Sequence, residues 1–456
     1  MRTTLTQAQL EATLGALARA NQAVMAGLPG DDGERQAVHT VYGGAHLFRA
    51  DTAARLGTTA LRSLDEYAPD PASFAHVLDL PAPLARPVYE RVREKLGREP
   101  VEDFRIDFED GYGNRPDAEE DGHAESAARE LARAWNEGSA PAFTGIRIKP
   151  FSDELKGRSA RTLDLFLTSL RDAAAGKAWR GGFVVTLPKV THPGQVAALA
   201  DLLDPLETAL GLPAGTIPIE LMIETPQSIF DARGAVALPG LVAAGHGRCR
   251  SAHFGTYDYT ASLDVTAAFQ HMTHPACDFA KHVLQVSLAG TGVRISDGAT
   301  NILPVAPHRA APDGSALTAE QTEANRRAVH AGWALHYRHV RHSLEGAYYQ
   351  GWDLHPAQLP TRYAAVYTFF LEGLDAAAER LRNFVGKAAQ ATLVGDVFDD
   401  AATGQGLLNY FLRAINCGAI DEAEASRRSE LSLEELRSRS FVRILAGRRA
   451  AGQLPR

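Results

Sequence analysis

The sequence predicts an α/β protein built as one (β/α)8 TIM barrel, with an enlarged helical excursion and a C-terminal helical lobe. Eight short apolar runs recur along the 456 residues, and most of them precede a segment with helical periodicity. Such an alternation indicates parallel strands joined by crossover helices, and eight units favour closure into a barrel. A doubly wound open sheet is the alternative, but its usual GxGxxG turn is not completed anywhere in the chain.

The eight predicted strands lie, in order, within residues 37–48, 103–111, 143–151, 182–190, 217–225, 250–260, 292–304 and 350–360. The barrel domain therefore spans 37–360. An N-terminal helical extension covers 1–36, and a helix-rich lobe or lid covers 361–456. Segment 311–349 predicts the enlarged helical excursion between the seventh and eighth strands.

The composition excludes several classes of protein. A net charge of −8 argues against a general nucleic-acid surface, which needs clustered lysine and arginine. The three cysteines are far apart and form no CxxC pair, so we expect neither disulfides nor a zinc–thiolate site. The expected location of the protein is a reducing cytoplasm. The N-terminus is typical of an amphipathic helix rather than a signal peptide, and no stretch is apolar for long enough to span a membrane.

Polar residues close each predicted strand. In a parallel barrel the active site lies at the C-terminal ends of the strands, so these side chains are expected to face one mouth. From strand two to strand eight they are Asp107, Glu109, Asp110, Arg147, Lys149, Lys189, Glu224, Asp258, Asp297 and His355.

This mixture of carboxylates and cations predicts a site for a hard divalent cation. Mg²⁺ prefers oxygen ligands and keeps some of its waters, so Glu224 and Asp258 on adjacent strands suffice as protein ligands. Glu109 and Asp110 could add a water-mediated ligand. Arg147 is then expected to be free to bind a substrate carboxylate with both prongs of its guanidinium group. A metal chelated by a 2-oxo acid would stabilise an enolate.

Other polar residues have a structural interpretation. Asp107 alternates with apolar neighbours, and the structural alternative for it is an ion pair with Lys149 or Lys189 inside the barrel. His336, His339 and His342 are spaced by three on a predicted helix, which favours a solvated face. His271 and His274 precede Pro275 and are expected in a loop. The absence of HExxH and GxSxG motifs argues against a zinc protease and a serine hydrolase.

Six motifs occur along the predicted barrel: FRIDFEDG, IRIKP, VTLPKV, LMIETPQSIF, FGTYDYTASLD and WDLHPAQ. Together they resemble the superfamily of the citrate lyase β-subunit, malyl-CoA lyase and the class II 2-oxo acid aldolases, which is related in fold to malate synthase. The resemblance covers roughly residues 37–360. It implies Mg²⁺, or Mn²⁺ in its place, a CoA thioester as one potential substrate, and a homo-oligomer such as a trimer or hexamer.

The resemblance also implies roles for individual residues. Glu224 and Asp258 match the metal ligands, and residues 259–263 would offer backbone N–H groups to a substrate carboxylate. Four positions match the catalytic residues around them: Arg147, Glu109, Asp110 and Lys189. His355 would help to shape the mouth. The chain departs from the family at Tyr257 and Lys149.

A C-terminal aspartate completes the site in malyl-CoA lyase-like enzymes. Asp396, Asp399 and Asp400 are candidates for it here, with a solvated loop as the alternative.

The expected function is therefore a Mg²⁺-dependent carbon–carbon lyase or aldolase. Its substrate would be a hydroxy acid or the CoA thioester of one, and it would release or condense a 2-oxo acid such as glyoxylate or pyruvate. Two alternatives remain: a malate synthase-like condensation followed by thioester hydrolysis, and a non-catalytic partner subunit of a lyase complex. A binding role toward nucleic acid or membrane is not expected.

Overall fold

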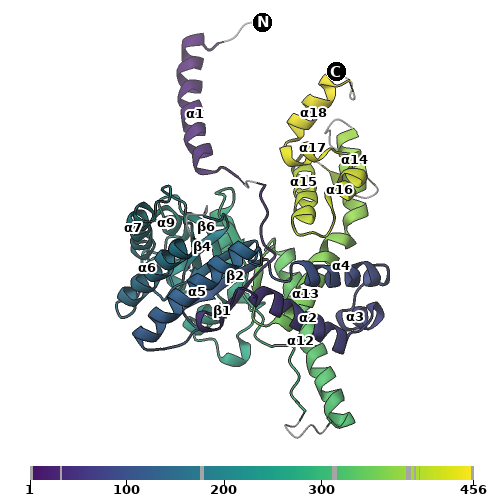
Figure 1. Cartoon of the computed structure of the whole chain (residues 1–456). Coiled ribbons are helices and arrows are strands. Elements are labelled where there is room, and N and C mark those ends of the chain that lie inside the picture. Colours follow the sequence, from purple (N-terminus) through teal and green to yellow (C-terminus); the bar gives the residue numbers. More distant parts are fainter. Residues whose placement is uncertain are drawn as a thin grey trace.

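The computed structural model describes residues 4–30, 33–174, 179–310, 316–386, 392–394, 397–399 and 401–452. Eight parallel strands form one sheet in the order β7-β6-β5-β4-β3-β2-β1-β8. Asp297 N–H donates to Gln350 O at 2.9 Å and Trp352 N–H donates to Gly298 O at 3.1 Å, which joins the two edge strands. The predicted (β/α)8 barrel is confirmed (Figure 1).

Seven of the eight strands of the barrel lie within their predicted runs. The strands are β1 (His39–Gly44), β2 (Asp103–Asp107), β3 (Phe143–Arg147), β4 (Phe183–Leu187), β5 (Ile219–Ile223), β6 (Cys249–Phe254), β7 (Arg294–Ser296) and β8 (Gly351–Asp353). Only β6 begins one residue before its run. Their outward-facing side chains pack against the surrounding helices, and one continuous apolar core results.

Helices of the barrel follow the strands. They are α2 (Thr52–Tyr67), α3 (Pro71–Leu78), α4 (Ala85–Arg98), α5 (Asp117–Glu137), α6 (Lys156–Ala173), α7 (Pro193–Ala209), α8 (Pro226–Ile229), α9 (Leu238–Ala243), α10 (Thr256–Ser262), α11 (Pro275–Leu288), α12 (Ala319–Glu345) and α13 (Leu359–Glu372). Proline opens α7 and α11, where its missing N–H costs no hydrogen bond.

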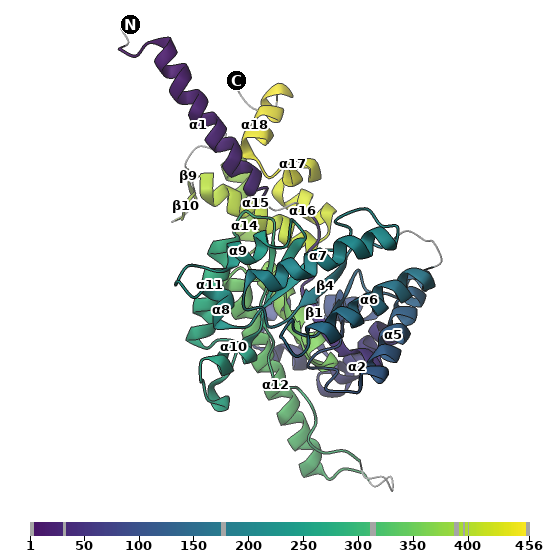
Figure 2. The same ribbon diagram turned by 90° about the vertical axis from the view of Figure 1, so that its left-hand side faces the viewer.

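The remaining elements extend from the barrel. They are α1 (Gln7–Gly27), α14 (Leu374–Gly386), β9 (Thr392–Val394), β10 (Val397–Asp399), α15 (Ala401–Asn416), α16 (Glu422–Ser429), α17 (Leu433–Ser438) and α18 (Phe441–Ala450). Helix α1 has no buried residue and stands away from the barrel, and α14–α18 gather into a separate lobe (Figures 1 and 2). Among the described helices, none has both the length and the apolar character needed to cross a bilayer.

Helix α12 corrects one expectation about the histidines. His336 and His339 are buried rather than solvated, and the imidazole of His336 lies 2.7 Å from Thr361 Oγ1 and 3.0 Å from Asp353 Oδ1. Asp353 also contacts His39 at 2.9 Å and accepts hydrogen bonds from Arg362. Helix α12 therefore packs His336 against the end of β8, and a three-residue spacing alone could not distinguish this arrangement from a solvated face.

Candidate active site

The C-terminal ends of β2 to β6 bring together the side chains that the sequence singled out. Asp107 and Arg147 end β2 and β3, Lys189 follows β4, Glu224 follows β5, and Asp258 lies in α10 directly after β6. Ion pairs connect six of the side chains at this end: Asp107, Glu109, Asp110, Arg147, Lys189 and Asp258. The fold therefore brings part of the expected set into contact at this end of the barrel.

Arg147 is almost completely buried, and its pairing differs from the expectation. Its Nε and Nη2 donate to the two carboxylate oxygens of Asp107 at 2.7 and 2.6 Å, so both prongs are already occupied. Its Nη1 forms an ion pair with Glu109 at 3.0 Å, but has no hydrogen-bond partner among the described residues. The expected bidentate contact between Arg147 and a substrate carboxylate is therefore not available in this conformation. Nη1 is the donor that remains.

Two aromatic rings flank the Arg147 guanidinium. Its carbon lies 4.8 Å from the centre of the Tyr42 ring and 5.5 Å from that of Trp352, and the two ring centres are 4.4 Å apart. Contact with the π faces favours a cation and offsets part of the cost of burying it. Trp352 Nε1 is buried and, like Arg147 Nη1, lacks a hydrogen-bond partner in the described part of the chain. Sequence reasoning missed this pair, because aromatic residues within strands usually belong to the core.

Lys189 links the acidic residues of the mouth. Its ammonium group pairs with Glu109, lies 3.2 Å from Asp110 Oδ2 and lies 3.6 Å from Asp258 Oδ1. Its backbone has a φ of 50°, in the left-handed region that a residue with a β-carbon rarely adopts. Backbone strain of this kind tends to collect at functional sites. In this conformation the Lys189 N–H donates to Glu224 Oε1 at 2.7 Å.

Glu224 is a buried carboxylate with an elevated pKa. Burial, and next the negative charge of Asp258, raise the pKa of Glu224 to about 7. Its carboxylate lies against the backbone of Gly255, where an added β-carbon would come within 2.4 Å of Oε2. Glycine at position 255 is thus required by the close approach of the two strand ends. Burial also raises the pKa of Glu109, although Arg147 and Lys189 oppose the shift.

Asp258 is the more exposed of the two predicted metal ligands, with 40% of its side chain accessible. It lies in the first turn of α10. The N–H groups of Tyr259 and Leu263 bond to Gly255 O and Thr260 O within this helical segment. These two groups are therefore not available to a substrate carboxylate, contrary to the expectation from the resemblance.

The donor set at the mouth fits a hard cation. Asp107, Glu109, Asp110, Glu224 and Asp258 provide carboxylate oxygens, against the positive charges of Arg147 and Lys189. Among the described residues, no group of three or more histidine, cysteine, aspartate or glutamate side chains is arranged to hold a metal ion. Two carboxylates remain the predicted set, which suits Mg²⁺ because this ion retains waters and binds substrate oxygens.

Four other candidates have structural roles. Lys149 pairs with Glu120 at 2.9 Å and donates to Phe108 O, and Asp297 pairs with Lys281 at 3.0 Å. The His355 ring accepts the Ala357 N–H at 3.1 Å. Asp107 pairs with Arg147, rather than with either lysine that the sequence suggested.

The candidate C-terminal aspartates cannot be placed at the mouth. Asp396 and Asp400 lie outside the described residues, as does the side chain of Asp399.

Comparisons with known proteins give one family match and similar solved structures, of which the citrate lyase structure supports the fold. A family described as "Domain of unknown function (DUF6986)" matches residues 17–444. A crystal structure of a citrate lyase from Burkholderia xenovorans LB400 is 19% identical, with a TM-score of 0.53, over 87% of this chain and 96% of that one. A Haloferax volcanii malate synthase is 12% identical, with a TM-score of 0.45, over 90% and 99% of the two chains. A search of curated protein sequences finds no match. The resemblance stated from the motifs is thus confirmed for the fold.

Proposed function

The chain belongs to the family of unknown function DUF6986, and we propose that it is a Mg²⁺-dependent carbon–carbon lyase or aldolase. Its substrate would be a hydroxy acid or the CoA thioester of one, and a 2-oxo acid such as glyoxylate or pyruvate would be released or condensed. The observation that carries this proposal is the placement of Glu224 and Asp258 near the buried Arg147, whose Nη1 pairs with Glu109 but makes no hydrogen bond within the described part of the chain.

Glu224 and Asp258 would hold the cation. Their mutual repulsion helps to raise the pKa of Glu224, and a divalent ion between two carboxylates removes this cost. When bound, the ion would stabilise negative charge on the oxygens of a 2-oxo acid. Lys189 orients both ligands, through its N–H to Glu224 and its ammonium group near Asp258.

Arg147 would bind the oxygen atoms of the substrate. Asp107 fixes the guanidinium plane through Nε and Nη2, so Nη1 is held in one direction. A preorganised donor needs no reorganisation as charge develops on an oxygen, which is the arrangement that stabilises enolate-like states. Glu109 accepts a hydrogen bond from Lys189 and forms an ion pair with Arg147 Nη1. When substrate binds, Nη1 would exchange part of its contact with Glu109 for a contact with a substrate oxygen.

Enolisation can be tested without knowledge of the second substrate. The full chain is incubated in D₂O with Mg²⁺ and either pyruvate or acetyl-CoA, and loss of the methyl proton signal is followed by NMR. We expect exchange that requires Mg²⁺ and falls at least 100-fold in Glu224→Gln and Asp258→Asn. The exposed Glu154→Gln, in the loop after β3, is the matched control and should retain the rate.

Addition of glyoxylate to the incubation with acetyl-CoA separates the alternatives. A lyase that runs in the condensing direction would give a thioester product, whereas free CoA would favour condensation followed by hydrolysis. Lack of exchange with both compounds in the presence of Mg²⁺ would contradict the proposal and favour a partner subunit.

A further inference from the structure

Helix α1 is rich in apolar residues, yet none of its 21 residues is buried. More than half of the surface is exposed at four large apolar side chains: Leu14, Leu17, Val24 and Met25. In proteins most of the stability of a helix comes from the packing of an apolar face, and a fully solvated helix relies instead on many charge pairs one turn apart. Helix α1 has one acidic and one basic residue, eight positions apart. Its apolar face therefore calls for a partner.

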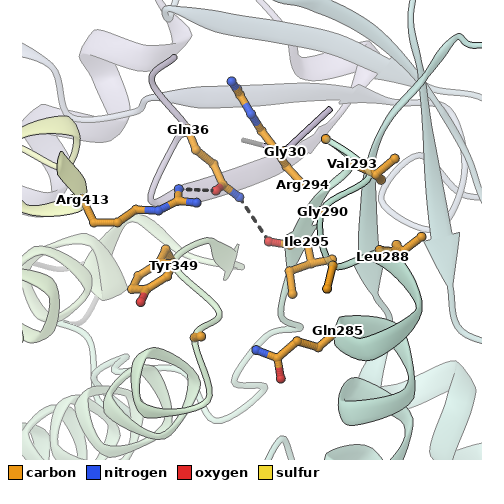
Figure 3. Close-up of a pocket in the computed structure, with 13 residues that line it drawn as sticks. Gly30, Gln36, Gln285, Leu288, Gly290, Val293, Arg294, Ile295, Tyr349 and Arg413 are labelled. Carbon is orange, nitrogen blue, oxygen red and sulfur yellow. Dashed lines mark hydrogen bonds between the residues drawn. The ribbon is translucent and has the colours of Figure 1, made fainter. Parts of the chain in front are cut away.

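The segment that follows α1 is attached to the base of the barrel. Gly30 N–H donates to Gly290 O at 2.8 Å. Further along, the Gln36 amide nitrogen donates to Ile295 O at 3.1 Å, and its oxygen accepts from Arg413 at 2.9 Å (Figure 3). Gly290 precedes β7 and Gln36 precedes β1, so α1 leaves the barrel at the end opposite to the mouth. A partner of α1 would thus leave the mouth open.

The apolar residues of α1 repeat with the spacing of a coiled coil. When the helix is written as heptads abcdefg with Gln7 at position a, the next a position holds Leu14, and the d positions hold Leu10, Leu17 and Val24. In a coiled coil each side chain at a or d inserts between four residues of the facing helix, and the seam is narrower than the face of a helix that packs on a globular core. The pattern therefore fits a second helix with the same seam.

Asn21 indicates which helix this is. It occupies the third a position, and in a parallel pair in register it lies opposite Asn21 of the other helix, so that the two amides bond to each other. An apolar surface of another kind would leave the amide buried without a partner, which is unfavourable. Glu11 is the only charged residue at the e and g positions of α1, so like charges do not face each other across the seam. The single basic residue, Arg19, is too little for attachment to an anionic membrane.

We propose that α1 forms a parallel, two-stranded coiled coil with α1 of a second copy of this chain. A single asparagine at an a position specifies the register and favours two strands. The seam is about 32 Å long, since α1 rises about 1.5 Å per residue. Because three heptads make a short coiled coil, the pair is expected to dissociate on dilution. The two barrels are joined through their bases, and both mouths stay accessible.

Disulfide cross-linking of the full chain tests this pairing without any measurement of activity. The three natural cysteines are buried, so a cysteine introduced on α1 is the one that reacts under mild oxidation. A disulfide requires Cα atoms within about 7 Å, which equivalent a positions of a parallel pair satisfy. We expect Asn21→Cys to form a covalent dimer at least tenfold faster than Ala12→Cys, the matched control at position f on the outer face. Both residues are exposed.

A charge placed in the seam provides the second test. Leu14→Asp should slow the cross-linking of Asn21→Cys at least tenfold, whereas Gln22→Asp, at position b on the outer face, should leave the rate unchanged. Leu14 and Gln22 are both exposed, so neither change removes a core contact. Equal rates for Asn21→Cys and Ala12→Cys would overturn the proposal, and an α1 that packs on its own barrel would give that result. Cross-linking that Leu14→Asp does not slow would overturn it as well.

Discussion

Arg147 and Asp107 are register partners at the ends of β3 and β2, and two hydrogen bonds of 2.7 and 2.6 Å join their side chains. Both groups are buried. The pair thereby fixes the guanidinium plane against Tyr42 and Trp352 and leaves Nη1 as the donor that faces Glu109. Asp107 therefore determines that Nη1 is the arginine nitrogen directed at the other charged groups of the mouth.

Loss of Asp107 should destabilise the protein and disorder the arginine. Asp107→Ala leaves a buried guanidinium without its partner, which typically costs about 3–5 kcal/mol. Chemical unfolding measures this cost. Asp153→Ala is the control, because Asp153 is 90% exposed in its ion pair with Lys156, and its change should stay within about 0.5 kcal/mol. Similar effects of the two substitutions would contradict the assigned role of Asp107.

Gly255→Ala should displace Glu224. The added methyl group would lie within 2.4 Å of Oε2, and neither the strand end nor the buried carboxylate can move freely. We expect Mg²⁺ affinity, measured by calorimetry, to fall at least tenfold. Gly97→Ala is the control, because Gly97 lies in α4 and no atom comes within 4 Å of the added carbon. Helix propensity predicts that this substitution stabilises the protein by about 1 kcal/mol. Unchanged Mg²⁺ binding in Gly255→Ala would mean that Glu224 is not a ligand.

The stability of the metal-free protein should depend on pH through Glu224. Its folded-state pKa, raised to about 7 by burial and by Asp258, exceeds its unfolded value, so the folded state binds this proton more tightly. Stability from this group is present below the unfolded pKa and is lost as pH rises through the folded one. The shift from 4.5 to about 7 corresponds to a loss of about 3.5 kcal/mol, at about 1.4 kcal/mol per pKa unit.

Comparison with Glu224→Gln isolates this effect. The variant has no titrating group at position 224, so we expect its unfolding free energy to exceed that of the natural chain at pH 8 and to approach it near pH 5. Saturating Mg²⁺ should remove the difference in pH dependence, because the ion competes with the proton. A difference that does not vary between pH 5 and pH 8 would refute the assigned pKa.

His336 and His342 lie on the same helix and should respond differently to substitution. His336 is buried and contacts Thr361 and Asp353, so His336→Ala creates a cavity and leaves polar groups unsatisfied. We expect a loss of about 2–4 kcal/mol in unfolding free energy. His342 is 40% exposed beside Asp278, and His342→Ala should cost less than about 1 kcal/mol. Equal losses would argue against the buried network.

Much of the fold could be predicted because a parallel strand buried on both faces produces a continuous apolar run. Polar residues that end such a run are conspicuous, which is why Arg147, Glu224 and Asp258 were identified. The register between neighbouring strands is not visible in a single sequence. The pairing of Asp107 with Arg147, and hence the use of both arginine prongs, could not be foreseen.

Residues that act through distant contacts were also missed. The burial of His336 depends on Asp353, which is 17 positions away, and a three-residue spacing fits a buried face as well as a solvated one. Tyr42 and Trp352 meet Arg147 only after β1 and β8 close the barrel. The hydrogen bond from Arg413 to Gln36, which are 377 positions apart, likewise forms only in the folded chain.

The most direct test of the central claim is a thermal unfolding titration with Mg²⁺, in the presence and absence of glyoxylate, pyruvate and oxaloacetate. A ligand that binds only the folded chain stabilises it by about 2.7 kcal/mol at 100 times its Kd. We predict that one of these oxo acids raises the melting temperature only when Mg²⁺ is present, and that Glu224→Gln or Asp258→Asn abolishes this rise. A melting temperature that neither Mg²⁺ nor any of the three acids changes would contradict the proposed site.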